Sequence, residues 1–190
     1  MNKGYLTCDR GSNSDHVYTP FYAVEPLLKY IPKDWVIWCP FDLEWSAFVQ
    51  TFRRQGYEVV HSHIDTGEDF FKFTPNRYFD CIVSNPPFSI KDKVIKCLYE
   101  IGKPFAILLP LNSLQGQARY KSFKKGIQLL AFDKRIDYHT NENYSTITRG
   151  NHFASAYFCK DLLPTDLILE KLHKYERPLK GSTNETKKFI

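Results

Sequence analysis

Residues 85–88, Asn-Pro-Pro-Phe, combine side chains and backbone groups that suit the binding of an amino group. Two consecutive prolines fix the φ angle and remove two backbone donors, so the segment is stiff and presents its carbonyl groups. The Asn85 side chain adds an amide oxygen, and two acceptors on a rigid turn can hold both hydrogens of an –NH2 group. Phe88 offers a flat face to a planar ring. We therefore expect this motif to hold the amine of a planar base so that its nitrogen can attack an electrophile without a charged base.

A buried strand is predicted before this motif and a helix after it. Residues 78–83 form a short apolar stretch that is typical of a buried strand. Ser89 can cap the helix, with Asp92 at the capping-box position, and Gly102 lies where the helix ends. The motif then follows the carboxyl end of a strand, which is where open α/β sheets bind their ligands.

The position of Asn-Pro-Pro-Phe after an apolar strand resembles the catalytic motif of S-adenosylmethionine-dependent amino methyltransferases, in particular the adenine-specific DNA methyltransferases. The resemblance implies S-adenosylmethionine as cofactor, adenine in DNA as substrate, and direct transfer of a methyl group to the exocyclic amine. It assigns the catalytic role to Asn85, Pro86, Pro87 and Phe88. For the tetrapeptide alone, a proline-stiffened turn with a packed phenylalanine is an equally good interpretation, so the rest of the chain must decide.

Two segments before the motif resemble the parts of this family that bind the methionine end of the cofactor. A Thr-Pro pair at residues 19–20 precedes the first predicted helix, which extends to residue 31. The strand predicted at 35–39 and the Pro-Phe after it resemble the cofactor loop, but Cys39 replaces the family's acidic residue and the glycines are absent. Because a carboxylate is the natural partner of the methionine ammonium, we expect Asp42 or Glu44 to bind it. The implied cofactor residues of these segments are Tyr18, Thr19, Pro20, Cys39, Pro40, Phe41, Asp42 and Glu44.

The second predicted strand, residues 57–62, leads to candidates for the ribose and adenine of the cofactor. The family ends this strand with an acid that binds the ribose hydroxyls, and His63 lies at that position. Asp65 is the alternative, and a carboxylate is the better acceptor for a diol. Asp69 and Phe70 resemble the family pair in which the acid accepts from the adenine amine and the aromatic ring packs on the base. As the alternative, Phe70 is simply a core residue.

Two later segments are candidates for binding the substrate. Residues 115–126 are basic with interleaved aromatic residues, which fits either a phosphate-contacting stretch or the solvated face of a helix. The Arg-Ile-x-Tyr sequence at 135–138 resembles a family element whose aromatic residue helps to hold a flipped base. The substrate candidates are Phe88, Arg119, Lys121, Arg135 and Tyr138.

The order of the predicted elements favours a doubly wound α/β fold, Rossmann-like as in methyltransferases, with a mostly parallel sheet of seven-stranded type and helices on both faces. A helix is expected at 44–55, further strands at 104–109, 127–132 and 152–158, and a short amphipathic helix at 164–175. We expect a single domain at 1–176 and a polar tail at 177–190. No separate target-recognition domain is predicted, so segments 111–126 and 134–151 are the recognition candidates, and a partner subunit is a further expectation.

Composition limits the remaining possibilities. The 190-residue chain has a net charge of +5, which permits a polyanionic partner such as DNA, single-stranded DNA or RNA without requiring one. There is no apolar run of membrane-spanning length and no signal-peptide core, so a cytoplasmic protein is expected. The five cysteines are expected to be reduced, and His61 and His63 lack a third metal ligand, so no metal site is predicted. The alternatives are methylation of an RNA base or a protein glutamine by the same motif, and an inactive binding protein.

Overall fold

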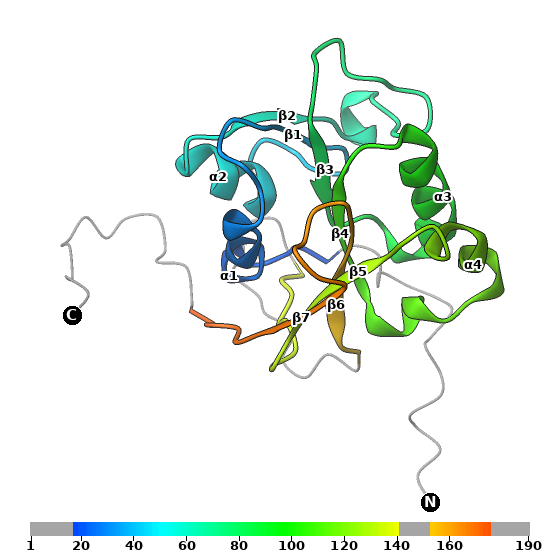
Figure 1. The fold of residues 1–190 in the computed structure, drawn as a ribbon. Helices are drawn as coiled ribbons and strands as arrows, with labels where there is room; N and C mark the ends of the chain where they lie inside the picture. Colours follow the sequence, from blue (N-terminus) through cyan, green and yellow to red (C-terminus); the bar gives the residue numbers. More distant parts are fainter. Residues whose placement is uncertain (1–16, 141–152, 176–190) are drawn as a thin grey trace, which may run out of the picture.

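The computed structural model describes residues 17–140 and 153–175, which form one mixed β-sheet with helices packed on it (Figure 1). The strands are β1 (Val36–Cys39), β2 (Glu58–His61), β3 (Cys81–Ser84), β4 (Phe105–Pro110), β5 (Gln128–Phe132), β6 (Ser155–Lys160) and β7 (Leu167–Glu170). The α-helices are α1 (Phe21–Val24), α2 (Ala47–Arg54), α3 (Lys91–Ile101) and α4 (Gln117–Phe123). Short 3₁₀ helices occur at Glu25–Lys29, Ile64–Thr66, Phe88–Ile90 and Leu111–Leu114.

The sheet has the strand order β2-β1-β3-β4-β6-β5-β7. All neighbouring pairs are parallel except the two that involve β6, so β6 runs opposite to the other six strands. After β2 the chain returns past β1 and places β3 on the other side of β1. The sheet therefore reverses its winding between β1 and β3, which is the point where open α/β sheets bind ligands.

Helices cover both faces of the sheet, as predicted (Figure 1). One face packs against α1 and α2 through residues such as Ile37 and Val83, and the other packs against α3 through Ile82 and Ile107. On α4, the Phe123 ring stacks on Phe158 of β6 with a centroid distance of 5.8 Å. Apolar side chains occur at consecutive positions in the central strands because a parallel sheet is buried on both sides.

Local capping determines where the helices begin and end. The Ser46 hydroxyl accepts a hydrogen bond from the Val49 backbone N–H at 3.3 Å, so α2 begins at Ala47 rather than at Glu44. At its end, α3 stops at Gly102, which has a φ of 71°. The first predicted helix is divided, because the chain tightens from α1 into a 3₁₀ helix whose second residue is Pro26.

Two predictions for the helices are wrong. Ser89 does not cap α3, because a 3₁₀ turn at Phe88–Ile90 precedes a helix whose N-cap is Ile90, without a side-chain cap. Asp92 pairs with Arg119 instead. The helix expected at 164–175 is absent, and β7 pairs in parallel with β5 there. The edge of β5 offers a row of backbone hydrogen-bonding groups, which outweighs the helical spacing of the apolar residues.

Within the two described ranges, no helix has both the length and the apolar character needed to cross a membrane.

Candidate active site

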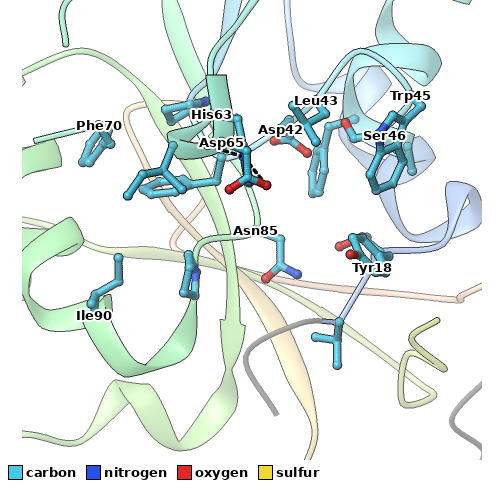
Figure 2. Close-up of a pocket in the computed structure, with 18 of the residues that line it drawn as sticks. Tyr18, Asp42, Leu43, Trp45, Ser46, His63, Asp65, Phe70, Asn85 and Ile90 are labelled. Carbon is cyan, nitrogen blue, oxygen red and sulfur yellow. Dashed lines mark hydrogen bonds and ion pairs between the residues drawn. The ribbon is translucent and has the colours of Figure 1, made fainter. Parts of the chain in front are cut away.

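A cleft of about 520 Å³ opens at the carboxyl ends of β1, β2 and β3, where the sheet reverses its winding (Figure 2). Its walls come from the loops after these strands and from the segment before α1. Most of the cofactor candidates and two residues of the Asn-Pro-Pro-Phe motif line it. These predicted residues are Tyr18, Thr19, Pro40, Phe41, Asp42, His63, Asp65, Asp69, Phe70, Asn85 and Pro87.

The Asn85 side chain lies in the wall of this cleft (Figure 2). Its Oδ1 atom is buried, and it has no hydrogen-bond partner within the described part of the chain. A buried acceptor without a donor costs about 1–3 kcal/mol, so such atoms occur where a ligand supplies the missing donor. Ser84, directly before it, is buried at the end of β3, and Pro87 closes the turn with a φ of −55°. The acceptor is therefore held in a stiff turn.

Thr19 provides a second polar atom of this kind. Its side chain is 5% exposed, and its Oγ1 atom has no hydrogen-bond partner among the described residues. The backbone around it is fixed, because Tyr18 and His139 exchange two backbone hydrogen bonds of 2.8 and 2.9 Å. Two residues from different segments, Thr19 and Asn85, thus line one cleft and each carries a buried, unsatisfied polar atom.

Asp42 is the buried carboxylate of the site. The hydroxyl groups of Ser84 and Ser46 donate hydrogen bonds to it. Loss of water raises its pKa from 3.8 to about 6, and these two hydrogen bonds offset only part of that effect. Among the described residues, the lining contains no lysine or arginine. A cationic ligand would therefore supply the charge partner that Asp42 lacks.

Glu44, the alternative to Asp42, faces away from the cleft. Its side chain is 61% exposed, and it pairs with Arg53 and with His61 Nε2 at 2.9 Å. The Arg53 pair lowers the pKa of Glu44. Because His61 is engaged by Glu44, the two histidines of β2 and its loop do not converge on one site. In the part of the chain that the structure describes, no three metal-ligating side chains cluster.

His63 and Asp65 form a linked pair on the wall beyond β2. The Asp65 backbone N–H donates to His63 Nδ1 at 3.1 Å, and an Asp65 carboxylate oxygen lies 3.3 Å from the same nitrogen, which leaves Nε2 as the ring nitrogen available to a ligand. The pair thus offers a donor on His63 and acceptors on Asp65, a combination suited to a diol. Both predicted candidates line the cleft, and the structure does not favour one over the other.

Asp69 and Phe70 lie on the wall beyond this pair. Asp69 accepts from the Phe71 backbone N–H at 3.1 Å, which fixes its carboxylate. Phe70 packs on Trp38 and Phe41 with centroid distances of 5.5 and 4.9 Å, and it also lines the cleft. Phe70 is consequently both a core residue and a wall residue.

The remaining cofactor and motif candidates lie outside the lining. Pro20, Cys39 and Pro86 are buried and are not among the lining residues, but each is next in sequence to a residue that lines the cleft. Burial in an apolar environment raises the pKa of the Cys39 thiol, so it stays a neutral core residue. Phe88 is partly buried beside the cleft and packs edge-on against Phe153, with a centroid distance of 5.6 Å.

Two of the substrate candidates are structural. Tyr138 is fully buried, its hydroxyl donates to Ser155 Oγ at 2.8 Å, and it does not line the cleft. Phe153 lies between the two predicted residues, with its ring centroid 5.6 Å from that of Phe88 and 6.0 Å from that of Tyr138. Arg119 is 8% exposed and packs its guanidinium against Gly116.

Arg119 joins α4 to the rest of the fold. It donates to the Ser113 carbonyl at 2.7 Å and to the Gln115 carbonyl, and it pairs with Asp92 of α3. These bonds occupy its guanidinium, so it is not placed to contact phosphate. Lys121 and Arg135 are exposed. Residues 141–151 of the second recognition segment, and the tail at 177–190, lie outside the described residues.

Sequence reasoning missed Trp45. Its ring lines the cleft and packs against Tyr18 with a centroid distance of 5.2 Å. The available signal was its position in the loop after β1, where the resembled family has glycines and this chain has a large aromatic residue. Phe153 was also missed, because nothing in its sequence context distinguishes it from a core residue.

The sequence matches no family model and no curated protein. Two solved structures show a weak similarity to its fold. A protein from Listeria monocytogenes assigned to the class I S-adenosylmethionine-dependent methyltransferases has a TM-score of 0.46 and 14% identity, covering 86% of this chain and 68% of that one. A type I restriction-modification methyltransferase subunit from Streptococcus thermophilus has a TM-score of 0.45 and 11% identity, covering 84% of this chain and 48% of that one. Structural similarity at this level gives no information about the function of this protein.

Proposed function

We propose that the protein is an S-adenosylmethionine-dependent methyltransferase that modifies the exocyclic amine of adenine in DNA. The observation that carries the proposal is the buried and unsatisfied Oδ1 of Asn85, a residue that lines the cleft where the sheet reverses its winding. An amine hydrogen is the donor that this oxygen lacks. The stiff Asn-Pro-Pro-Phe turn supplies the Pro86 carbonyl as a second acceptor from the same segment.

The residues of the cleft fit the proposed cofactor. Asp42 suits the ammonium of its methionine part, and the unsatisfied hydroxyl of Thr19 can hydrogen-bond at the same end. His63 Nε2 and the Asp65 carboxylate suit the ribose hydroxyls, while Asp69 and Phe70 suit the adenine amine and ring. S-adenosylmethionine would supply an electrophilic methyl group on a sulfonium sulfur.

The chain's own contribution to the reaction is positioning. Asn85 Oδ1 and the Pro86 carbonyl would accept the two hydrogens of the target amine, which directs the nitrogen lone pair away from the ring. Well-oriented reactants gain several orders of magnitude in rate, so no charged base is needed before the attack. The proton that the amine loses afterwards can pass to solvent. Phe88 and Phe153 offer aromatic surface for a base that leaves its stack at a cost of a few kcal/mol.

Methyl transfer to DNA tests this proposal directly. Tritiated S-adenosylmethionine would be incubated with double-stranded DNA, single-stranded DNA and RNA, using the natural protein and Asn85→Ala. Removing a group that stabilises only the transition state lowers turnover by about 100-fold or more. Asn85→Ala should therefore lose transfer but still bind the cofactor in calorimetry. Ser89→Ala is the matched control, because Ser89 is exposed four residues away and should keep full activity.

Each outcome of this experiment is informative. Near-full activity of Asn85→Ala would contradict the proposed role of its oxygen. Transfer to RNA alone, or to a glutamine peptide in a parallel assay, would keep the chemistry and replace the substrate. Failure of the natural protein to bind the cofactor at millimolar concentration would refute the proposal and favour an inactive binding protein.

A partner subunit is part of the proposal. Of the first recognition segment, 111–126, the buried Arg119 is structural, which leaves exposed lysines such as Lys121 for phosphate contact. Phosphate contacts position a protein on DNA but carry no sequence information. Base-edge contacts would therefore have to come from the second segment or from another chain.

A further inference from the structure

An aromatic pair forms one end of the cleft (Figure 2). Tyr18 comes from the segment before α1, and Trp45 comes from the loop between β1 and α2. Their ring centroids are 5.2 Å apart and their planes are inclined by 59°, so the two rings form a corner rather than a stack. In Figure 2 both rings lie near Asp42, while Phe70 and Ile90 lie at the opposite end.

Hydrogen bonds hold the backbone segments that carry the two rings. Tyr18 and His139 exchange two backbone hydrogen bonds of 2.8 and 2.9 Å. Trp45 is followed by Ser46, whose backbone N–H donates to the Leu43 carbonyl at 2.9 Å and whose side chain caps α2. The corner is therefore preorganised, and a ligand that enters it would not have to order these segments.

The electrostatic character of this end favours a cation. The face of an aromatic ring carries negative potential, and cations bind over it within about 6 Å of its centre. Asp42 adds a buried carboxylate in the same loop as Trp45. No lysine or arginine of the described chain lines the cleft, and the acidic groups elsewhere in its lining are Asp65 and Asp69, of which Asp69 pairs with Lys72 Nζ at 3.5 Å. Two ring faces beside a carboxylate are a combination that recognises organic cations.

We propose that Tyr18 and Trp45 recognise the sulfonium charge of S-adenosylmethionine, so that the cleft prefers the charged cofactor to its product, S-adenosylhomocysteine. This inference rests on the proposed function and adds a source of discrimination to it. Both compounds carry the methionine ammonium, so Asp42 binds both. Only the cofactor carries a positive sulfur, and the cation–aromatic contact depends on that charge. When the methyl group is transferred, the sulfur loses its positive charge and the cation–aromatic contact is lost. This loss would favour release of the product.

Calorimetric titration with both compounds tests the inference through binding rather than activity. The natural protein, Trp45→Leu and Tyr18→Leu would each be titrated with S-adenosylmethionine and S-adenosylhomocysteine. Loss of one cation–aromatic contact of about 1 kcal/mol weakens binding about five-fold. Each leucine variant should show this loss for the cofactor and little change for the product. Trp45→Phe keeps a ring, so it should keep most of the preference.

Asp42→Asn is the comparison variant: it removes the ammonium partner that both compounds share, so it should weaken binding of the product as well, which the leucine variants should not. Equal losses for cofactor and product in Trp45→Leu and Tyr18→Leu would overturn the inference and leave the proposed function intact. The same holds if the natural protein binds both compounds equally well. Binding of neither compound by the natural protein would overturn the proposed function as well. Tyr18 and Trp45 lie on different segments, so one variant remains interpretable if the other does not fold.

Discussion

Replacing Asp42 with asparagine is expected to stabilise the cofactor-free protein while weakening its binding of S-adenosylmethionine. Asp42 is buried, and desolvation raises its pKa from 3.8 to about 6. Asparagine has nearly the same shape, and the hydroxyl groups of Ser84 and Ser46 can donate to its side-chain oxygen or accept from its amide nitrogen. The substitution therefore removes a buried charge and leaves the packing in place.

The size of the effect follows from the pKa. A rise from 3.8 to about 6 corresponds to about 3 kcal/mol of lost stability once the carboxylate is ionised. The native protein holds this proton more tightly than the unfolded chain does, so the penalty grows between these two pKa values and is complete above about pH 6. Asp42→Asn should therefore raise the melting temperature at about pH 8 by up to roughly 6–12 °C. At about pH 5 the gain should be about half as large.

Thermal unfolding at both pH values measures this gain, and calorimetry measures the accompanying loss of cofactor affinity. Asp65→Asn is the matched control, because that side chain lines the same cleft but is 72% exposed and keeps its water. It should change the melting temperature little at either pH. A lower melting temperature for Asp42→Asn at the higher pH, or an equal gain at both, would show that Asp42 is not a desolvated charge.

Three further predictions concern residues outside the cleft. Gly102→Ala should lower the free energy of unfolding by about 1 kcal/mol in urea denaturation, because an alanine is strained at a φ of 71°. The space around the Cβ position is open, so no steric clash adds to this cost. Arg119→Met should cost about 3–5 kcal/mol, since it leaves Asp92 and the Ser113 carbonyl without their donor. The DNA affinity of the folded Arg119→Met variant should not change. A selective loss of DNA affinity would instead support the phosphate contact that the sequence predicted for Arg119. Lys121→Glu should weaken DNA binding and reduce the slope of log affinity against log salt by about 1, whereas an unchanged slope would exclude a phosphate contact.

Most strands of the central sheet were predictable from local sequence. The apolar stretch at 104–109 predicted β4, and the structure places that strand at Phe105–Pro110. Such runs are informative because a strand buried on both faces needs apolar residues at consecutive positions. The last strand, β7, was not predictable in this way, because Ile168 and Leu172 have helical spacing as well as core contacts. Its conformation depends on the free edge of β5, which no local pattern reveals.

The sequence by itself determined what the motif at 85–88 can do. Prolines stiffen a turn and an asparagine offers an acceptor wherever they occur, so these properties do not depend on the fold. It also predicted the doubly wound arrangement, because alternating strands and helices have few ways to pack. These inferences concern residues that are neighbours along the chain.

Only the tertiary structure decided which of the candidates meet. It turned Asp42 toward the cleft and Glu44 toward Arg53, and it buried Tyr138 and Arg119. It also brought Tyr18 against Trp45, 27 positions later in the chain. Distances between remote residues depend on the strand order and on the packing of helices against the sheet. Strand order and helix packing depend on residues throughout the chain, so no single motif determines which remote residues come together.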